Sequence, residues 1–308
     1  MFAKTHFMEF AMGTVAKTAL IAAIVAASPA FAAEPDWNQV SQALGKSGAM
    51  QAGGVYRVGF PRTDLTVTLD SVTLRPGFAL GGWVAFQPMG AETMVMGDLV
   101  LTQDEVNPVM RKLKEGSIEI TALHNHLLRA EPMTFYMHIE GHGDPVKLAS
   151  AIQSGLALSK IPFSPPPGSA MPTDIDMIGI DRIMGYFGQD NGGVYQFGIP
   201  RAQPVTERGM ALPGSMGAAN AINFQPTGFH TAAITGDFVL ASEEVNPVIK
   251  ALQAHGIEVT ALHSHMLSEQ PRMFFLHFWA NDDALKLATG LRAALDQVDV
   301  KKDAASAK

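Results

Sequence analysis

Six histidines recur in two sets with the same spacing, and imidazole is the commonest protein ligand of metals. The stretch TALHNHLLRAE (121–131) returns as TALHSHMLSE (260–269), and one more histidine follows each stretch. The sets are His124, His126 and His138, and His263, His265 and His277. Imidazole suits zinc, and no redox ligand is evident. We therefore expect each copy to bind zinc or another divalent metal, or else a small polar ligand.

The two histidines of each stretch are expected to lie on one face of a strand. Side chains at i and i+2 in a strand project from the same face, about 6.6–7 Å apart. The returning strand of a hairpin lies about 4.8 Å away, which brings His138 to the level of Leu123 or one residue to either side. The turn length decides whether His138 shares the face. Three nitrogen ligands on one face would leave a fourth position open.

Two functional classes fit this pattern. As an enzyme, the chain would be a metal-dependent hydrolase in which the metal activates water. The alternative is a non-enzymatic envelope interaction module with structural histidines, since histidines in half-buried strands often bond to a carbonyl or a carboxylate. Methionines beside the histidines would suit copper, although core packing also explains them.

Carboxylates supply further candidates. Glu131 and Glu269 follow the histidine pairs and are the candidate acid–base residues, although a carboxylate in a turn is usually only solvated. The order His-x-His…Glu also resembles the first motif of a cupin, but helices are expected on both sides of the motif and cupins are built of strands. Asp98 and Asp237 each follow a glycine and are interpreted as bulge or turn residues.

Four more charged residues recur in both copies. Glu105 and Glu244 fall in the first turn of an expected helix, where they would interact with the helix dipole. Arg62 and Arg201 follow a proline that ends a strand. We expect these arginines to form surface salt bridges or to bind an anion.

The elements that must position these residues are written twice, with an offset of 139 residues. Eight of the eleven positions in Ile118–Leu128 are identical to those in Ile257–Leu267. A period this long indicates duplicated domains and not a solenoid.

Each copy predicts the same order of elements. In the first copy, helices are expected at 36–46, 102–116 and 144–158, and strands at 53–61, 65–69, 83–87, 93–102, 118–128 and 133–141. Thr102 and Glu105 fit a capping box; in the second copy Ser242 is the expected cap. Helices packed on a mainly antiparallel sheet make an α+β fold in each of two homologous tandem domains.

Composition excludes several classes of protein. The chain has 308 residues, 47% apolar and 17% charged, as in globular proteins. Its net charge is −7 without a basic run, so nucleic acid and anionic membrane surfaces are not expected partners. The absence of cysteine excludes disulfides, thiolate metal sites and a lipid-modified cysteine.

The first 32 residues have the pattern of a secretory signal peptide. Lys4 and Lys17 precede the apolar run 18–27, and Ala30-Phe-Ala32 forms the cleavage motif. We expect cleavage after Ala32 and a periplasmic protein without a membrane anchor. The predicted boundaries are signal peptide 1–32, first repeat domain 33–160, Pro-rich linker 161–173, second repeat domain 174–300 and polar tail 301–308.

The paired units resemble a known family. The runs GDLVLTQDEVNPVMRKL and GDFVLASEEVNPVIKAL, with the histidine stretches that follow them, are similar to the bacterial envelope family typified by the mycobacterial lipoproteins LppY and LpqO. The resemblance implies export and two tandem units of unknown function, and it assigns no reaction. A small ligand or an envelope component is the expected partner, with the oligomeric state open. Lacking the lipoproteins' cysteine, this chain is expected to be free in the periplasm.

Overall fold

The computed structural model describes residues 1–4, 34–164 and 172–302. Most of the predicted signal peptide with its cleavage point, most of the Pro-rich linker and most of the polar tail lie outside these ranges. Contacts group Ala33–Lys308 into one unit that contains both repeats. Within the described ranges, no helix has the length and apolar character needed to cross a membrane.

Each repeat contains a six-stranded sheet in which all neighbours are antiparallel. The strands of the first sheet are, in spatial order, β1 (Ala49–Gln51), β2 (Val55–Pro61), β5 (Gly81–Met89), β6 (Glu92–Thr102), β8 (Thr134–Gly143) and β7 (Glu119–His124). The strands of the second sheet are β9 (Gln189–Asn191), β10 (Val194–Pro200), β13 (Ala219–Gly228), β14 (Thr231–Leu240), β16 (Phe274–Asp283) and β15 (Glu258–His263). The predicted tandem α+β architecture is confirmed.

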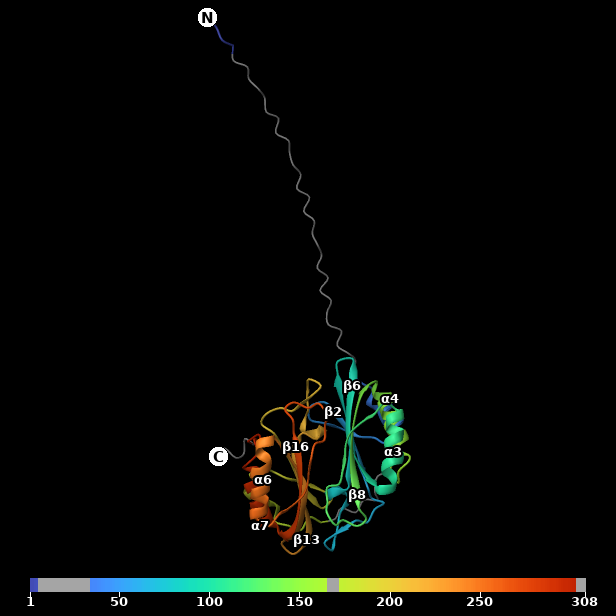
Figure 1. Ribbon diagram of the computed structural model, residues 1–308, viewed down its shortest axis with the longest axis vertical. Coiled ribbons are helices and arrows are strands. Elements are labelled where there is room, and N and C mark those ends of the chain that lie inside the picture. Colours follow the sequence, from blue (N-terminus) through green and yellow to red (C-terminus); the bar gives the residue numbers. More distant parts are fainter. Residues whose placement is uncertain (5–33, 165–171, 303–308) are drawn as a thin grey trace. The chain divides into compact units, whose positions relative to one another are not determined.

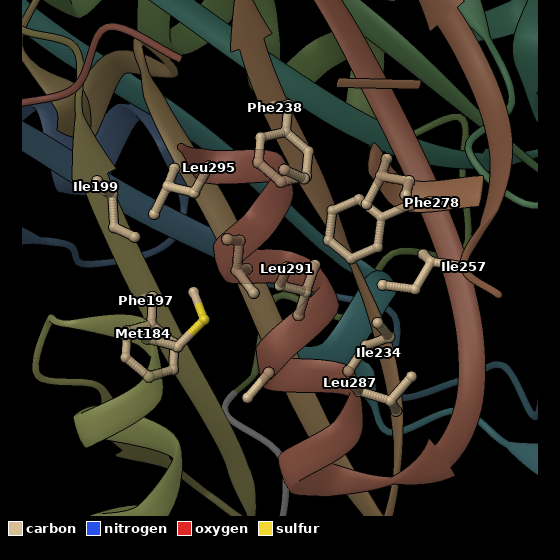
Figure 2. Close-up of a cluster of buried hydrophobic side chains, with 14 of the residues drawn as sticks. Met184, Phe197, Ile199, Ile234, Phe238, Ile257, Phe278, Leu287, Leu291 and Leu295 are labelled. Carbon is tan, nitrogen blue, oxygen red and sulfur yellow. The ribbon is translucent and has the colours of Figure 1, made fainter. Parts of the chain in front are cut away.

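Helices cover one face of each sheet. The first sheet carries α1 (Trp37–Leu44), α3 (Gln103–Glu115) and α4 (Pro145–Leu156), and the second carries α5 (Met177–Met184), α6 (Ser242–Ala254) and α7 (Ala284–Leu295). Within the Ala33–Lys308 unit the layers run helices, sheet, sheet, helices (Figure 1). Leu287 and Leu291 of α7 pack against Phe278 of β16 in the second core (Figure 2). Each sheet therefore has its second face directed away from its helices.

The helix starts follow from local sequence. Thr102 and Glu105 form the predicted capping box of α3. In the second copy the predicted cap is wrong by one residue, because Ala241 is the N-cap and Ser242 already lies in α6. Ala241 offers no side-chain acceptor, and its backbone N–H donates instead to Glu244 Oε2 at 2.7 Å.

The recurring Arg–Glu pairs are buried. Arg62 is 0% exposed and its Nη1 lies 2.7 Å from Glu105 Oε2; Arg201 is 7% exposed and lies 2.6 Å from Glu244. The prediction of surface arginines is therefore wrong. Each arginine also donates to a carbonyl of the central strand, Val100 or Val239, so each pair ties a strand end to a helix start.

Each repeat sends an arm across the second face of the other repeat's sheet. Arm 1, residues 67–80, contains β3 (Thr68–Leu69), β4 (Val72–Thr73) and α2 (Pro76–Ala79). It accepts hydrogen bonds from Gln225 Nε2 at Thr73 O and from Gln196 Nε2 at Gly77 O, at 2.8 and 2.9 Å. The expected strand at 65–69 is reduced to Thr68–Leu69, and Val67 and Leu69 lie in a core shared with the second repeat.

Arm 2, residues 205–219, is the counterpart in the second repeat, with β11 (Thr206–Glu207), β12 (Met210–Ala211) and the 3₁₀ turn η1 (Gly214–Met216). Its Ser215 carbonyl accepts from Arg57 Nη1 at 2.9 Å. Two apolar cores beneath the arms mix residues of both repeats, such as Leu69 with Trp279 and Met94 with Met216. The repeats are thus joined by shared cores as well as by the chain between them.

The start of the predicted linker belongs to the first core. Ile161 is 4% exposed and lies in the apolar cluster beneath α4, and Phe163 packs against the same cluster. These apolar side chains tie residues 161–163 to the first repeat, so the predicted linker 161–173 begins within the first core.

Candidate metal centre

Strand pairing decides which histidines share a face. In the β7–β8 hairpin, Ala122 lies opposite His138 and His124 opposite Tyr136. Residues directly opposite across an antiparallel pair share a face, so His124 and His138 point the same way. His138 is one residue from the level of Leu123, within the predicted window.

His126 lies outside the strand in which it was predicted. β7 ends at His124, so His126 lies in the segment that follows the strand and not within it. A bulge between Ile120 and Ala122 interrupts the regular pairing of this strand. The same arrangement recurs in β15, which ends at His263 and leaves His265 beyond it.

The two sets of histidines meet at one place. Across the repeats, the ring centroids of His124 and His263 are 3.5 Å apart, those of His126 and His277 3.6 Å, and those of His138 and His265 3.7 Å. The spacing in the sequence predicts a separate site in each repeat. In the structure the sites are adjacent, because the histidine-bearing faces of the two sheets are opposed.

Two aspartates complete the site. Asp98 lies opposite His138 in the β6–β8 pair, and Asp237 lies opposite His277 in the β14–β16 pair. The interpretation of both as bulge or turn residues is wrong, since each sits within a continuously paired strand. The Gly-Asp pair that recurs in both copies is the sequence feature that could have indicated these two site residues. A Cβ on Gly236 would lie 2.0 Å from Ala221 O, so the glycine allows neighbouring strands to approach there.

Within the described part of the chain, three groups of side chains have ligand atoms close enough to hold an ion. Each repeat provides one triad, and a third group spans both repeats. The groups are Asp98, His126 and His138; Asp237, His265 and His277; and His124, His126, His263 and His265. In each group the ligand atoms lie within 4.8 Å of one another.

Many polar atoms of this centre are buried without a hydrogen-bond partner among the described residues. They are Asp98 Oδ1, His124 Nδ1, His124 Nε2, His126 Nε2, His138 Nε2, Asp237 Oδ1 and His277 Nε2. Buried polar groups in folded proteins are nearly always paired, and an unpaired one costs about 1–3 kcal/mol. A concentration of unpaired atoms of metal-ligating types is the pattern expected where an ion completes the site.

His277 is oriented as a metal ligand. Its Nδ1 lies 2.8 Å from Gly236 O, and because a carbonyl oxygen only accepts, Nδ1 carries the proton. The Nε2 lone pair is then free, and this atom lies 3.6 Å from Asp237 Oδ1. A ligating histidine commonly has its other nitrogen bonded to a carbonyl in this way.

Burial sets the protonation of the centre. It lowers the pKa of His124 to about 4 and of His277 to about 3, and it also lowers the pKa of the other four histidines. All six are therefore neutral near pH 7, as ligation requires. Burial also raises the pKa of Asp98 to about 7, against the charge of Arg57, and the pKa of Asp237 well above its usual range. A bound cation would favour the ionised carboxylates.

A cavity of about 920 Å³ gives access to both triads. Its lining includes Asp98, His126, His138, Asp237, His265 and His277. The lining extends to Phe187, which is 70% exposed, so the cavity reaches the molecular surface. Four of the six histidines thus border a cavity, and all six lie between the sheets.

The candidate acid–base residues lie elsewhere. The Glu131 side chain is exposed, and its backbone pairs with Thr68 of arm 1. Glu269 is 2% exposed and accepts a hydrogen bond from the Met273 N–H at 3.0 Å. Neither belongs to the ligand groups or to the cavity lining of the described chain.

Comparison with known proteins adds a family match. The family model described as Domain of Unknown Function (DUF1259) matches residues 38–158 and again residues 179–297. No curated protein matches the chain. The trimeric bacterial microcompartment shell protein PduB is 14% identical over 84% of this chain and 96% of its own, with a TM-score of 0.21. EtuB from Clostridium kluyveri is 9% identical over 82% and 90%, also with a TM-score of 0.21, and neither likeness indicates a function.

Proposed function

Because the chain belongs to the family described as Domain of Unknown Function (DUF1259), whose name assigns no activity, we propose a function from the site itself. The two repeats together bind divalent metal ions, one at each Asp-His-His triad. His124 and His263 lie between the triads and complete the centre. The observation that carries the proposal is the set of buried, unpaired ligand atoms around this one location.

Zinc is the ion we expect. The donor set is imidazole nitrogen and carboxylate oxygen without sulfur, which suits zinc. Two histidines and one carboxylate are also the ligands of non-haem iron(II) sites. Iron(II) is therefore the competing ion, and metal analysis separates the two.

Metal-dependent hydrolysis is the second candidate function, favoured by the cavity. Both triads line one cavity that reaches the surface, so a small molecule has a path to them. Three protein ligands leave a coordination position free for water or substrate. A zinc ion in such a position lowers the pKa of water toward neutrality, which is the chemistry that hydrolysis requires.

The proposal also includes export and the narrower envelope family. The pattern of the first 32 residues supports a signal peptide, and the likeness to the LppY/LpqO-type lipoproteins supports an envelope protein. The protein would then take up its metal in the periplasm.

Metal analysis tests the proposal directly. Mature protein purified without a histidine tag is incubated with zinc, iron(II), copper or manganese, desalted, and analysed by mass spectrometry. We expect about two equivalents of zinc in the wild type and in the exposed-site control His230→Gln. The double variant His138→Gln/His277→Gln, which removes one ligand from each triad, should lose most of the zinc and keep its circular dichroism spectrum. Failure of all four metals to bind would refute the proposal.

A further inference from the structure

The cavity is chemically asymmetric although the fold is duplicated. Arg57 lines it in the first repeat, where the second repeat has Gln196 at the equivalent position of β10. Trp83 of β5 lies opposite Asp98, and Ala221 of β13 takes the equivalent place opposite Asp237. Among the described residues that line the cavity, an arginine beside a tryptophan therefore occurs in the first repeat only.

Arg57 is held in place without a carboxylate partner. Its guanidinium carbon lies 4.2 Å from the centroid of the Trp83 ring, and its Nη1 donates to Ser215 O at 2.9 Å. Among the described residues, no carboxylate lies within salt-bridge distance of it. The aromatic ring and arm 2 thus fix the orientation of this cation and leave other donors of its guanidinium free.

Arg57 differs from two other arginines of the chain, each of which pairs with a glutamate. Arg62 and Arg201, which are more deeply buried, each face a glutamate at 2.7 and 2.6 Å. A partly buried charge without such a partner is costly unless something else supplies the anion. Burial lowers the pKa of Arg57 to about 10, against the charge of Asp98, and the guanidinium remains charged at neutral pH.

We propose that the cavity binds an organic oxyanion, a carboxylate or a phosphate monoester attached to a flat apolar body. The Arg57 guanidinium holds the oxyanion, because its planar fork matches carboxylate and phosphate oxygens. The Trp83 side chain borders the apolar body. Arg57, Trp83 and Asp98 line the same cavity, so a ligand held at Arg57 lies beside the first triad.

This inference names the ligand class of the proposed metal centre and so rests on the proposed function. It differs in the residues that it requires. Arg57 belongs to none of the ligand groups, so its substitution should leave metal content unchanged. Ligand binding and metal binding can therefore fail separately.

Calorimetric titration provides the test, with benzoate, phenyl phosphate and neutral benzamide as probes of zinc-loaded and metal-free protein. We expect one of the anions to bind and benzamide not to bind, and the anion that binds identifies the class. Arg57→Gln, which copies Gln196, should weaken binding at least tenfold at unchanged zinc content. Arg57→Lys should weaken it less, because the charge remains, and the exposed control Arg111→Gln should bind as the wild type does.

The inference is overturned if no anion binds to the wild type, if benzamide binds as tightly as benzoate, or if Arg57→Gln binds normally. If zinc never binds but the anion still binds in an Arg57-dependent manner, the metal proposal fails and the oxyanion site stands. If zinc binds and the anions do not, the oxyanion site is refuted and the metal proposal stands.

Discussion

His277 Nε2 lies 3.6 Å from Asp237 Oδ1, and in the first repeat His138 Nε2 lies 3.9 Å from Asp98 Oδ1. These distances are longer than hydrogen bonds. They are also short enough for one ion to contact both atoms, since zinc bonds to nitrogen and oxygen are each about 2 Å long. The distances are similar in the two repeats, so the two triads are equivalent sites on opposed sheets.

Asp237→Asn should have opposite effects on the two forms of the protein. In the metal-free form Asp237 must take up a proton on folding near neutral pH, because burial raises its pKa. Asparagine removes that cost, so the unfolding free energy should rise by about 1–3 kcal/mol. In the metal-bound form it removes a charged ligand, so zinc affinity should fall at least tenfold. Urea denaturation and competitive chelator titration measure the two effects, with exposed Asp104→Asn as control. A variant that is destabilised without metal would contradict this account.

Zinc should stabilise the fold. A ligand that binds only the native state at 100 times its Kd adds about 2.7 kcal/mol per site. Differential scanning fluorimetry should show a rise of several degrees in Tm with zinc, reversed by EDTA. Magnesium, which prefers oxygen ligands, should give little change. An equal shift with both ions would argue against an imidazole site.

Arg62→Met should be strongly destabilising. It leaves Glu105 buried without its cation, which typically costs about 3–5 kcal/mol. Lys112→Met is the matched control, because Lys112 pairs with Glu115 at the surface and such pairs contribute less than about 1 kcal/mol. The comparison uses urea unfolding of metal-free protein. Similar losses for both variants would contradict the buried role of Arg62.

Glu207→Leu should stabilise the protein above neutral pH. Glu207, in arm 2, is 0% exposed, and neither carboxylate oxygen has a partner among the described residues. Burial and the nearby charges of Glu140 and Glu269 together raise its pKa to about 7, against the charges of Arg208 and Arg272. The equivalent position in arm 1 is Leu69, because β3 (Thr68–Leu69) corresponds to β11 (Thr206–Glu207) with an offset of 138 in this segment.

The sign of the pH effect follows from this raised pKa. Between about pH 4 and pH 7 the folded state keeps a proton that the unfolded state has lost, so wild-type stability falls as pH rises through that window. Relative to the wild type, Glu207→Leu should gain about 1–3 kcal/mol between pH 5 and pH 8. Chemical denaturation at several pH values measures the difference. A constant difference between the two proteins would exclude the titration of Glu207.

The exported protein should begin at Ala33. Cleavage after Ala32 follows from the Ala30-x-Ala32 motif at the end of the apolar run. Intact mass and N-terminal peptide mapping of protein from the periplasmic fraction check the position. Ala32→Lys should block cleavage, because the peptidase requires a small residue there. Recovery of unprocessed chain in the cytoplasm would contradict export.

Local patterns in the sequence predict the local elements well. The hairpin of β7 and β8, its register near Leu123, and the capping box at Thr102 all follow from short-range spacing. Because the unit is duplicated, each local pattern occurs in both repeats and supports the same prediction twice. Helices on an antiparallel sheet follow from the same periodicities.

The features that local patterns did not predict depend on contacts between the repeats. The crossing of arm 1 joins Asp70 to Trp279 at 3.0 Å, and no periodicity within one repeat indicates such a contact. Asp98 was misjudged because a glycine before it suggested a turn, whereas the glycine allows two strands to approach. The meeting of His124 with His263 requires the two sheets to oppose their histidine-bearing faces, which is a tertiary property.

Covalent fusion of the two units has an evolutionary consequence. In a symmetric homodimer of single units, every substitution would occur on both sides of the axis at once. A fused chain is released from that constraint and can specialise one side while keeping the other. The exchanged arms keep the halves together, while Arg57 in one half corresponds to Gln196 in the other and Leu69 corresponds to Glu207. A ligand held at Arg57 would therefore be bound by one half of the molecule only.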